Sequence, residues 1–375
     1  MKLLLIDQVP EVNDKYSFAL AKAIKEQGID ITFCGAKSDV CKTDLFENYI
    51  TLFDNYSKVG NLFKKVMCYN QSWKRIIRYV KENNIDVVHV QWFIFSPLDY
   101  YYIRKLKRAG VKVVDTIHDL LPFNRKFYDF FFHKKIYNMV DAIISQATKN
   151  IERLVGEFDV DASKVKYIPH GHFMDYAEVA SREESREYLN IPNDKKVILF
   201  FGQIKKVKGI DILIKALPKV IEKHKDVVCI IAGKVWKDDF AQYDALIDKL
   251  GLNDYVQKNI RYIGDDEIKY FFNAADIVAM PYREIYQSGV VLLSYAYRKP
   301  VVATTEGEFV NVVKDKETGL LVPSEDEEAF AKGLNWYLDN PEKINEFGQA
   351  GYEDLSVRLS WTNIAKDIVS LYKCL

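Results

Sequence analysis

Short apolar runs alternate with amphipathic, helix-like stretches along almost the whole chain, and this alternation restricts the possible folds more than any other feature. The first group of runs comprises Leu3–Ile6, Ile31–Cys34, Val87–Val90, Val111–Val114 and Ala142–Ser145. The second group comprises Val197–Phe201, Val228–Ala232, Ile260–Ile263, Ile277–Met280, Val301–Thr304 and Leu320–Val322. Continuous Val, Ile and Leu runs are typical of parallel strands that helices cover on both faces. We therefore predict an α/β protein with two Rossmann-like, doubly wound sheets in tandem.

The length of the chain, 375 residues, exceeds what one hydrophobic core usually serves, so two domains are expected. A charged stretch at residues 174–195 has the composition of a linker with one short helix. We place a first domain at residues 1–176 and a second at residues 177–356. Residues 357–375 contain an amphipathic helix from Trp361 that follows a complete second sheet and can pack back on the first domain.

Composition excludes several classes of protein. Lys plus Arg and Asp plus Glu both number 53, so the overall charge does not indicate nucleic-acid binding. The five cysteines show neither CxxC nor Cys/His zinc spacing, which suits a reducing compartment and no structural metal. The first apolar run is closed by Asp7 and is too short for a signal peptide, and no run approaches the roughly 18 apolar residues of a membrane helix. A cytoplasmic protein is expected.

The segment from Pro281 to Pro323 predicts a phosphate-binding turn between two buried strands. Pro281 stops the apolar run before it, and Gln287-Ser288-Gly289 opens an apolar helix. A helix N-terminus presents unpaired N–H groups and a partial positive charge, and Gly289 lets a ligand approach the backbone. An ordinary strand-turn-helix unit without a ligand is the alternative.

A second glycine turn follows the first strand of the second sheet, in the sequence Phe200-Phe-Gly-Gln-Ile-Lys-Lys-Val-Lys-Gly209. Ligands of doubly wound sheets bind at the carboxyl ends of the strands, where this turn is expected. Lys205, Lys206 and Lys208 offer ammonium groups to a diphosphate. A solvated basic loop is the alternative.

The order of short motifs along the chain resembles that of the retaining family 4 glycosyltransferases of the GT-B fold, over nearly the whole length. The matching motifs are Asp86-Val-Val-His-Val, Thr116-Ile-His-Asp119, Tyr167-Ile-Pro-His-Gly171, Phe201-Gly202 through Lys208-Gly209, Ile231-Ala-Gly233, Ala275-Asp276-Ile with Pro281, Lys299-Pro-Val-Val and Thr318-Gly-Leu-Leu-Val-Pro323. The resemblance implies two Rossmann-like domains that face each other across a cleft. It implies that the second domain holds a nucleotide sugar, that the first presents the acceptor, and that no metal or other cofactor takes part.

The resemblance also implies roles for single residues. Catalytic roles fall on His118 and on Lys208, which matches the family lysine that binds the donor phosphates. The implied donor-binding residues are Gly202, Gln203, Lys205, Lys208, Gly233, Ile263, Tyr286, Gln287, Ser288, Gly289, Val290 and Ser294. The implied acceptor or cleft residues are His170, Gly171 and Asp119. In the mechanism usually proposed for the family, a donor phosphate oxygen takes the acceptor proton. Asp159-Val160-Asp161 imitates a metal-binding motif, but its polar surroundings favour a chance match.

The chain departs from the family pattern at several of these positions. Tyr286 and Ser294 stand where the common signature has glutamates, as in a subgroup that reads QSG at the turn, and Gln203 replaces the usual arginine. Lys205 is placed to compensate for that arginine. Glu306 or Glu308 is a candidate to approach the donor in place of the missing glutamates.

The basic residues of the first half cluster with aromatic residues. Between Lys58 and Lys135 the chain has 16 Lys and Arg but 6 Asp and Glu, and the basic aromatic segments begin at Phe63, Trp73 and Phe123. Such segments suit the anionic surface of a bacterial inner membrane, with solvated helix faces as the alternative.

The leading functional prediction is sugar transfer from a nucleotide sugar to a saccharide or lipid-linked saccharide in surface polysaccharide or glycoconjugate synthesis. A non-catalytic partner subunit and a nucleotide-sugar epimerase of the same architecture remain as alternatives. A nicotinamide dehydrogenase is disfavoured, because no GxGxxG follows the first strand.

Overall fold

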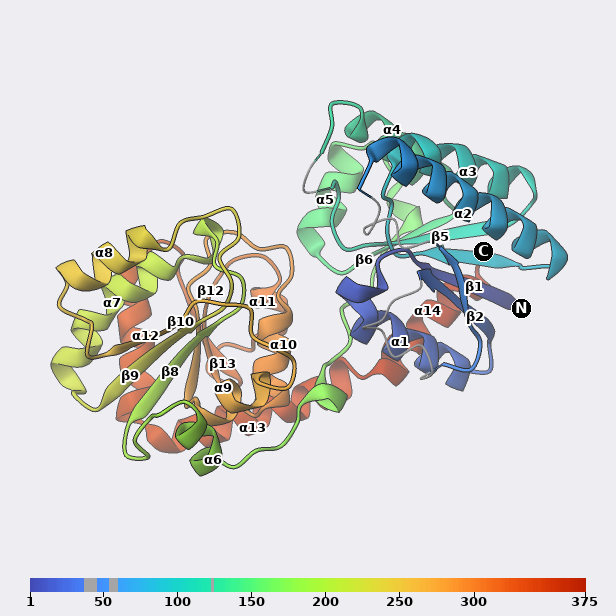
Figure 1. Cartoon of the computed structure of the whole chain (residues 1–375). Coiled ribbons are helices and arrows are strands. Elements are labelled where there is room, and N and C mark those ends of the chain that lie inside the picture. The colour runs from blue at the N-terminus through green and yellow to red at the C-terminus, as the bar shows by residue number, and fades with distance from the viewer. Residues whose placement is uncertain (37–45, 54–59, 123–124) are drawn as a thin grey trace. The chain divides into compact units, whose positions relative to one another are not determined.

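The computed structural model describes residues 1–36, 46–53, 60–122 and 125–375. They form two compact units: the first combines residues 1–171 with 359–375, and the second comprises residues 172–358. Each unit is a parallel sheet between two helical layers (Figure 1). The predicted class, α/β with two Rossmann-like sheets, is confirmed.

The first sheet has the strand order β3-β2-β1-β4-β5-β6-β7. Its strands are β1 (Lys2–Asp7), β2 (Asp30–Ala36), β3 (Tyr49–Phe53), β4 (Val87–Val90), β5 (Lys112–Ile117), β6 (Ala142–Ser145) and β7 (Val165–Tyr167). In the centre Leu3 pairs with Ile31 on one side and with Val87 on the other, so the winding direction changes between β1 and β4. The helices are α1 (Pro10–Glu26), α2 (Leu62–Glu82), α3 (Ser96–Arg108), α4 (Asp129–Met139), α5 (Thr148–Gly156) and α14 (Trp361–Lys373).

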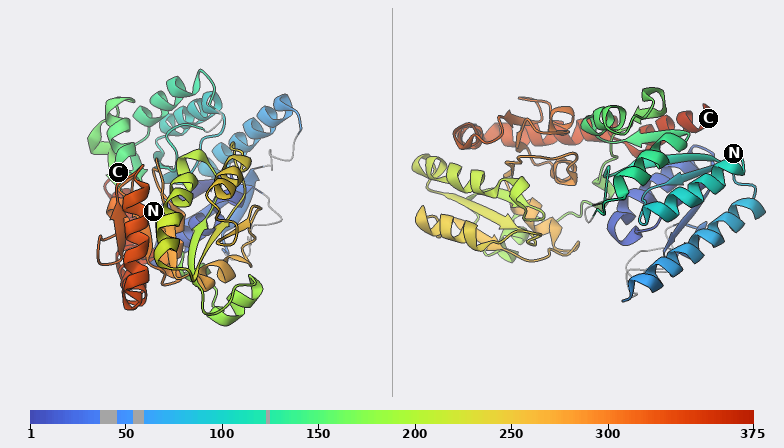
Figure 2. Two further views of the ribbon diagram at one scale, coloured as in Figure 1. Left: turned by 90° about the vertical axis from the view of Figure 1, so that its left-hand side faces the viewer. Right: turned by 90° about the horizontal axis from the view of Figure 1, so that it is seen from above.

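Two apolar clusters cover the two faces of this sheet. One cluster joins the sheet to α2, α3, α4 and α5 through residues such as Trp73, Tyr102 and Ile136. The other joins it to α1 and α14 through residues such as Leu20 and Ile368. Both chain ends therefore lie on the first unit, as Figure 1 and the right-hand view of Figure 2 show.

The second sheet has the strand order β10-β9-β8-β11-β12-β13. Its strands are β8 (Lys196–Phe201), β9 (Val227–Ala232), β10 (Val256–Asn259), β11 (Ile277–Met280), β12 (Val301–Thr304) and β13 (Gly319–Val322). The helices are α6 (Arg182–Tyr188), α7 (Ile210–Lys223), α8 (Ala241–Lys249), α9 (Ile268–Ala274), α10 (Gly289–Ala296), α11 (Phe309–Val312), α12 (Glu327–Asp339) and α13 (Pro341–Arg358). Helix α7 packs against α12 and α8, whereas α6 packs against α9 and α10 against α13 (Figure 1).

Two sequence predictions differ from the structure. The strand expected at Ile260–Ile263 lies one short segment earlier, as β10, because this edge strand pairs only with β9 and tolerates the polar side chains of Gln257 and Lys258. The first unit ends at Gly171 rather than at residue 176, and residues 172–176 belong to the second unit. Phe173, for example, lies over Gly289, where an added Cβ atom would sit 3.2 Å from its ring.

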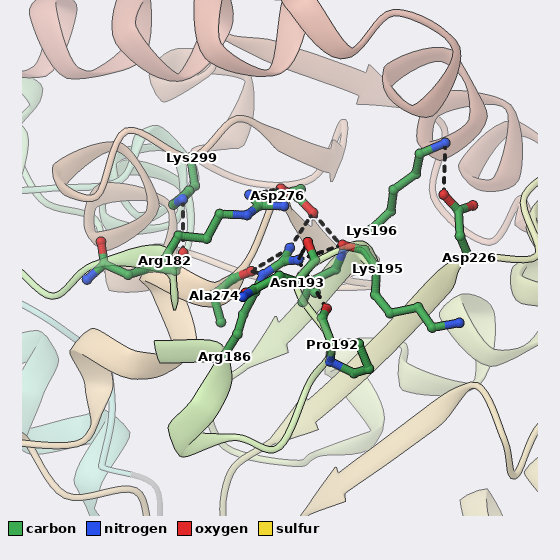
Figure 3. Close-up of polar contacts among 12 residues, drawn as sticks. Arg182, Arg186, Pro192, Asn193, Lys195, Lys196, Asp226, Ala274, Asp276 and Lys299 are labelled. Carbon is green, nitrogen blue, oxygen red and sulfur yellow. Dashed lines mark hydrogen bonds and ion pairs between the residues drawn. The ribbon is translucent and has the colours of Figure 1, made fainter. Parts of the chain in front are cut away.

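The segment Arg182–Tyr188 (α6) is fixed to the second sheet by a buried ion pair (Figure 3). The guanidinium of Arg186 is fully buried, and its Nη2 lies 3.1 Å from Asp276 Oδ2. Arg186 also donates to the carbonyls of Asn193 at 2.6 Å and Lys195 at 2.8 Å. These contacts lie at the amino ends of β8 and β11, opposite the edge where the predicted site residues lie.

Candidate functional site

In the second unit, the predicted donor residues follow the carboxyl ends of parallel strands or lie on the helix after one of them. Gly202 follows β8, Gly233 follows β9, and Ser288 and Gly289 lie between β11 and α10. The structure therefore brings the two predicted glycine turns to one edge of one sheet, beside the change of winding direction between β8 and β11. This is the place where doubly wound sheets bind ligands.

Glycines let three loops approach one another at this edge. Gly209 has φ +64°, and an added Cβ atom would lie 1.9 Å from the carbonyl oxygen of Pro281. Gly233 has φ +148°, and its added Cβ would lie 1.9 Å from the carbonyl oxygen of Gly202. Both backbones take conformations that favour glycine, and both contacts would clash with any side chain. The loops after β8, β9 and β11 can thus pack this closely only because glycine occupies both positions.

Lys208 is the central cation of this edge. Its Nζ lies 3.7 Å from the centre of the Tyr282 ring, a cation–π contact. No ion pair joins Lys208 to a carboxylate in the described part of the chain. Burial and the neighbouring charge of Lys205 lower the pKa of the Lys208 ammonium to about 7. An anion bound here would restore the charged form of the lysine.

Two buried hydroxyl groups, those of Ser288 and Tyr282, lie near the start of α10. Ser288 is buried at the N-cap position, its side chain caps no N–H of the helix, and its Oγ has no hydrogen-bond partner within the described residues. The hydroxyl of Tyr282 is buried as well, and burial raises its pKa, while the nearby Ser288 hydroxyl opposes that rise. Together with the first N–H groups of α10, these hydroxyl groups can donate hydrogen bonds to a bound anion.

Arg283 holds the lysine turn in place, a role that the sequence analysis missed. Its backbone N–H donates to the Val207 carbonyl at 2.8 Å, and its Nη1 donates to the Lys206 carbonyl at 3.1 Å. The guanidinium makes a two-point contact with Asp211, at 2.6 and 2.8 Å. Arg283 therefore orients the Lys208 turn from the β11 loop. No short motif marks such a long-range contact.

The remaining predicted donor residues differ in their surroundings. Ser294 is fully buried and donates to the Val290 carbonyl at 2.7 Å, so its hydroxyl is engaged within α10. Ile263 is buried in the loop after β10, while Gln203 is exposed and Lys205, Tyr286 and Gln287 are half-buried. Val290 Cγ2 would lie 3.5 Å from a Cβ atom on Gly202.

The candidate replacements Glu306 and Glu308 lie close to the same turn. Between them, Gly307 packs so tightly that an added Cβ would lie 1.8 Å from the carbonyl oxygen of Ile285. Glu308 is buried and accepts from Asn311 Nδ2 at 2.9 Å. The loop after β12 thus adjoins the β11 loop, and both carboxylates remain candidates for donor contact.

In the first unit, His118 and His170 come together at the carboxyl edge of the sheet. The ring of Tyr16 lies 5.1 Å from the His118 ring and 4.8 Å from the His170 ring, between centroids. His118 also stacks on Trp92 at 4.7 Å. Burial, with smaller effects of His170 and His89, lowers the pKa of His118 to about 3, and burial lowers that of His170 to about 4. Both imidazoles are therefore neutral near pH 7.

A chain of hydrogen bonds orients His118. Its Nε2 donates to Gln91 Oε1 at 3.0 Å, and the Gln91 amide NH₂ faces His89 Nε2 at 3.4 Å. His89 Nε2 also accepts from Thr116 Oγ1 at 2.7 Å, so its Nδ1 carries the proton and donates to the Tyr372 hydroxyl at 2.6 Å. The buried His89 thus connects α14 to the predicted catalytic histidine.

The other predicted residues of the first unit are placed as follows. Gly171 is buried against Trp361 of α14, whose ring would lie 2.6 Å from an added Cβ atom. Asp119 lines a cavity beside His118. The Asp159 and Asp161 carboxylates serve local contacts instead, an ion pair with Lys134 and a bond from the backbone N–H of Ser163 at 2.9 Å.

Family models match both units. Residues 15–172 match the model described as Glycosyltransferase Family 4, and residues 181–354 match the model described as Glycosyl transferases group 1. An uncharacterized glycosyltransferase of Methanocaldococcus jannaschii is 29% identical over 59% of this chain and 57% of its own length. The D-inositol 3-phosphate glycosyltransferase of Saccharomonospora viridis is 26% identical over 84% of this chain and 76% of its own length. For the first of these relatives, the match thus spans less than two thirds of the protein.

Solved structures agree with this assignment at the level of the fold. The Anabaena protein HepE, solved in complex with UDP, superposes with a TM-score of 0.78 at 18% identity, with 100% of both chains covered. A glycosyltransferase from Rickettsia africae superposes with a TM-score of 0.76 at 21% identity, covering 99% of this chain and 97% of its own. The two family models together span most of the chain, so each unit belongs to a glycosyltransferase family, and the whole chain shares the two-unit fold of these solved structures.

Proposed function

We propose that the protein transfers a sugar from a nucleotide-sugar donor, held by the second unit, to a saccharide or lipid-linked saccharide acceptor, held by the first. The reaction retains the anomeric configuration, needs no metal ion, and serves the synthesis of a bacterial surface polysaccharide or glycoconjugate. The observation that carries the proposal is the Lys208 ammonium, which is partly buried against the Tyr282 ring near the start of α10 and has no carboxylate partner among the described residues. The solved complexes of HepE with UDP and with UDP-glucose support a nucleotide-sugar donor.

The chemistry follows from where charge develops. As the bond between the sugar C1 and the donor phosphate oxygen breaks, negative charge accumulates on the departing diphosphate. A new bond forms between C1 and the acceptor oxygen, and the acceptor proton passes to a phosphate oxygen. Preorganised cations and N–H groups at Lys208 and at the start of α10 stabilise the leaving group directly. Neutral His118 contributes hydrogen bonding rather than charge to the sugar.

The test is direct binding of UDP, GDP, ADP and dTDP and their common sugar conjugates to purified protein without added metal. We expect one nucleotide sugar to bind selectively and Lys208→Ala to weaken it by about tenfold or more, since charge-assisted contacts contribute about 1.5–3 kcal/mol. Lys206→Ala is the matched control, because the Lys206 side chain belongs to the same turn but is exposed. Absence of binding to every nucleotide, or equal effects of both substitutions, would contradict the proposal.

The departures from the family pattern favour one alternative, a non-catalytic partner subunit. Ser294, which stands in place of a glutamate, is buried and bonded within its own helix. A turnover assay with the selected nucleotide sugar separates the two functions: release of the free nucleotide together with a glycosylated product supports transfer. Tight binding without turnover supports the partner subunit.

We also propose that the first unit docks on an anionic membrane surface through the N-terminal ends of α2 and α4. Leu62, Phe63 and Met67 are exposed at the start of α2, as are Phe127, Phe130 and Phe131 at the start of α4. Helix α3 lies between these two helices and contacts both (Figure 1). Apolar side chains interleaved with Lys64, Lys65 and Lys126 fit an interface with acidic headgroups.

The sequence prediction for this surface needs a correction at Trp73. That side chain is fully buried and donates from Nε1 to Asp99 Oδ1 at 3.1 Å, so its ring is not available to a membrane. Phe123 lies outside the described residues. No described helix combines the length and apolar character needed to cross a bilayer. Sedimentation with vesicles containing phosphatidylglycerol at low salt tests the proposal, and unchanged sedimentation of a Phe63→Ser, Phe131→Ser double variant would contradict it.

A further inference from the structure

A cavity of about 360 Å³ lies in the first unit between the carboxyl ends of β4 and β5 and helix α4. Its walls include Trp92, Asp115, His118, Asp119, His133 and Tyr137. This volume is in the range of sites that enclose small ligands. The cavity adjoins His118 but shares no residue with the lysine turn of the second unit.

Asp115 has an unusual position in this cavity. Its side chain is only 2% exposed, it lines the cavity, and no hydrogen bond joins its carboxyl group to any described residue. Burial, followed by the charge of Asp99, raises the pKa of Asp115 well above its ordinary value. A buried polar group without a partner is costly, so an unpaired carboxyl group that faces a cavity indicates a ligand or water that completes its bonds.

The other buried acids nearby have partners. Asp99 accepts from the Tyr69 hydroxyl at 2.6 Å, from Trp73 Nε1 at 3.1 Å and from the backbone N–H of Phe95 at 2.9 Å. Asp129 accepts from the Ser96 hydroxyl at 2.5 Å. Asp115 therefore differs from these neighbouring acids, because its carboxyl group can still form hydrogen bonds with a molecule in the cavity.

Trp92 adds a second unpaired polar group and a flat apolar face. Its Nε1 is buried without a hydrogen-bond partner within the described residues. Its ring stacks on His118 with 21° between the planes. Aromatic rings beside hydrogen-bonding groups are the usual means of holding a molecule that is apolar on one side and polar at its edge.

The described walls of the cavity carry no lysine or arginine. Its two histidines are disfavoured as cations, because burial lowers the pKa of His118 to about 3 and also lowers that of His133. Asp115 and Asp119 are the acidic groups. A phosphate or carboxylate placed here would lose its hydration without gaining an opposite charge.

We propose that this cavity binds an uncharged, hydroxyl-rich ring of the acceptor, such as an unphosphorylated sugar or polyol. Its hydroxyl groups bond to Asp115 and Trp92, and its ring face lies on the aromatic wall. The inference rests on the proposed function, since it identifies the cavity as the acceptor pocket. It separates this chain from the Saccharomonospora relative, whose name specifies a phosphorylated inositol.

The test measures binding of neutral and phosphorylated probes by saturation-transfer NMR at pH 7.5. The neutral probes are myo-inositol, methyl α-glucoside and methyl α-galactoside, and the anionic probes are inositol 3-phosphate and glucose 6-phosphate. We expect at least one neutral probe to bind and each phosphorylated probe to bind at least about tenfold more weakly, as an uncompensated buried charge requires. Equal or tighter binding of a phosphorylated probe, or no binding of any neutral probe, overturns the proposal.

Variants locate the bound probe. Asp115→Leu keeps the volume and removes the acceptor oxygens, and Trp92→Phe keeps a ring and removes the N–H. Each should weaken the neutral probe by about threefold to tenfold, the usual effect of one lost hydrogen bond. Asp86→Asn, at an acid that precedes β4 at the opposite edge of the sheet and does not line the cavity, is the matched control and should leave probe binding unchanged. Unchanged binding in both cavity variants overturns the proposal.

Two further measurements separate this proposal from the proposed function. Near-UV circular dichroism and cooperative unfolding of Asp115→Leu and Trp92→Phe show that the first unit is folded in these variants, and UDP binding shows that their second unit is intact. Lys208→Ala should lose UDP and keep the neutral probe. If neither the wild type nor any variant binds a nucleotide but the neutral probe still binds through Asp115, the donor proposal fails and the acceptor-pocket proposal stands. If a nucleotide binds but no neutral probe does, only the acceptor-pocket proposal fails.

Discussion

The free ammonium of Lys208 makes donor binding depend on pH. Burial and Lys205 lower its pKa to about 7 in the unliganded protein, and a bound diphosphate raises it. Between the two pKa values binding therefore takes up a proton, and affinity falls as the pH rises above about 7. Calorimetry of UDP binding at pH 8 in two buffers of different ionisation enthalpy should show uptake approaching one proton. Lys208→Arg should bind without uptake, and buffer-independent heats in the wild type would contradict this reading.

Gln91 is a positioning residue for His118. Gln91→Met removes the acceptor for the N–H of His118 Nε2. This bond orients the imidazole ring, so its loss should lower kcat by about tenfold while KM for the donor stays unchanged. Gln91→Glu keeps an acceptor oxygen and should recover most of the activity. Since the pKa of His118 is lowered to about 3, its titration should not appear in the pH profile of kcat between about pH 5 and 9. A variant that loses donor affinity instead would indicate a general structural role.

The sequence predicts that most candidate residues lie at the carboxyl edge of each sheet, but it does not predict which residues contact them. Short motifs predict that Lys208, Ser288 and His118 follow strands, because glycines and apolar runs mark the strand ends. Arg283 and Asp115 have no such mark. Their contacts join segments far apart in the chain, and an unpaired carboxyl group is visible only when the packing around it is known.

Among the elements, continuous apolar strands are the predictable ones. The runs at Val87–Val90 and Ala142–Ser145 become β4 and β6 with the expected limits, because central strands are buried on both faces. The apolar pattern does not predict the edge strand Tyr49–Phe53 (β3), and it predicts β10 too late in the chain. Edge strands pair on one side only, so polar side chains such as Gln257 interrupt the apolar signal.

Breaking the buried ion pair between Arg186 of α6 and Asp276, which precedes β11, should be strongly destabilising. Asp276 accepts from Arg186, from Arg182 and from the backbone N–H of Val197 at 2.7 Å (Figure 3). Asp276→Asn leaves the fully buried Arg186 without its counter-charge and should lower the free energy of unfolding by about 3–5 kcal/mol. Urea unfolding measures the change. Asp226→Asn, which breaks a more exposed pair with Lys196, should cost less than about 1 kcal/mol; equal losses would contradict the assignment.

For the whole molecule, the composition of the two units predicts different behaviour of fragments. Residues 172–358 form a contiguous unit with a complete sheet, so this fragment should fold alone and bind UDP with nearly the affinity of the full chain. Residues 1–171 lack α14 and leave the apolar face of α1 and β1 uncovered. That fragment should aggregate, and adding a peptide of residues 359–375 should restore solubility. Circular dichroism and size-exclusion chromatography distinguish the outcomes, and a monomeric, cooperatively folding fragment 1–171 would contradict the prediction.

The discontinuous first unit has a consequence for synthesis on the ribosome. Helix α14 is translated only after all of residues 172–358, which takes on the order of ten to forty seconds at roughly 5–20 residues per second. Throughout that interval, while the second unit is still being made, the nascent first unit has no cover for the surface that Ile364 and Ile368 later occupy. The segment that closes the first unit is thus made only after the whole second unit, and a holdase chaperone would find its target on the first unit during this part of elongation.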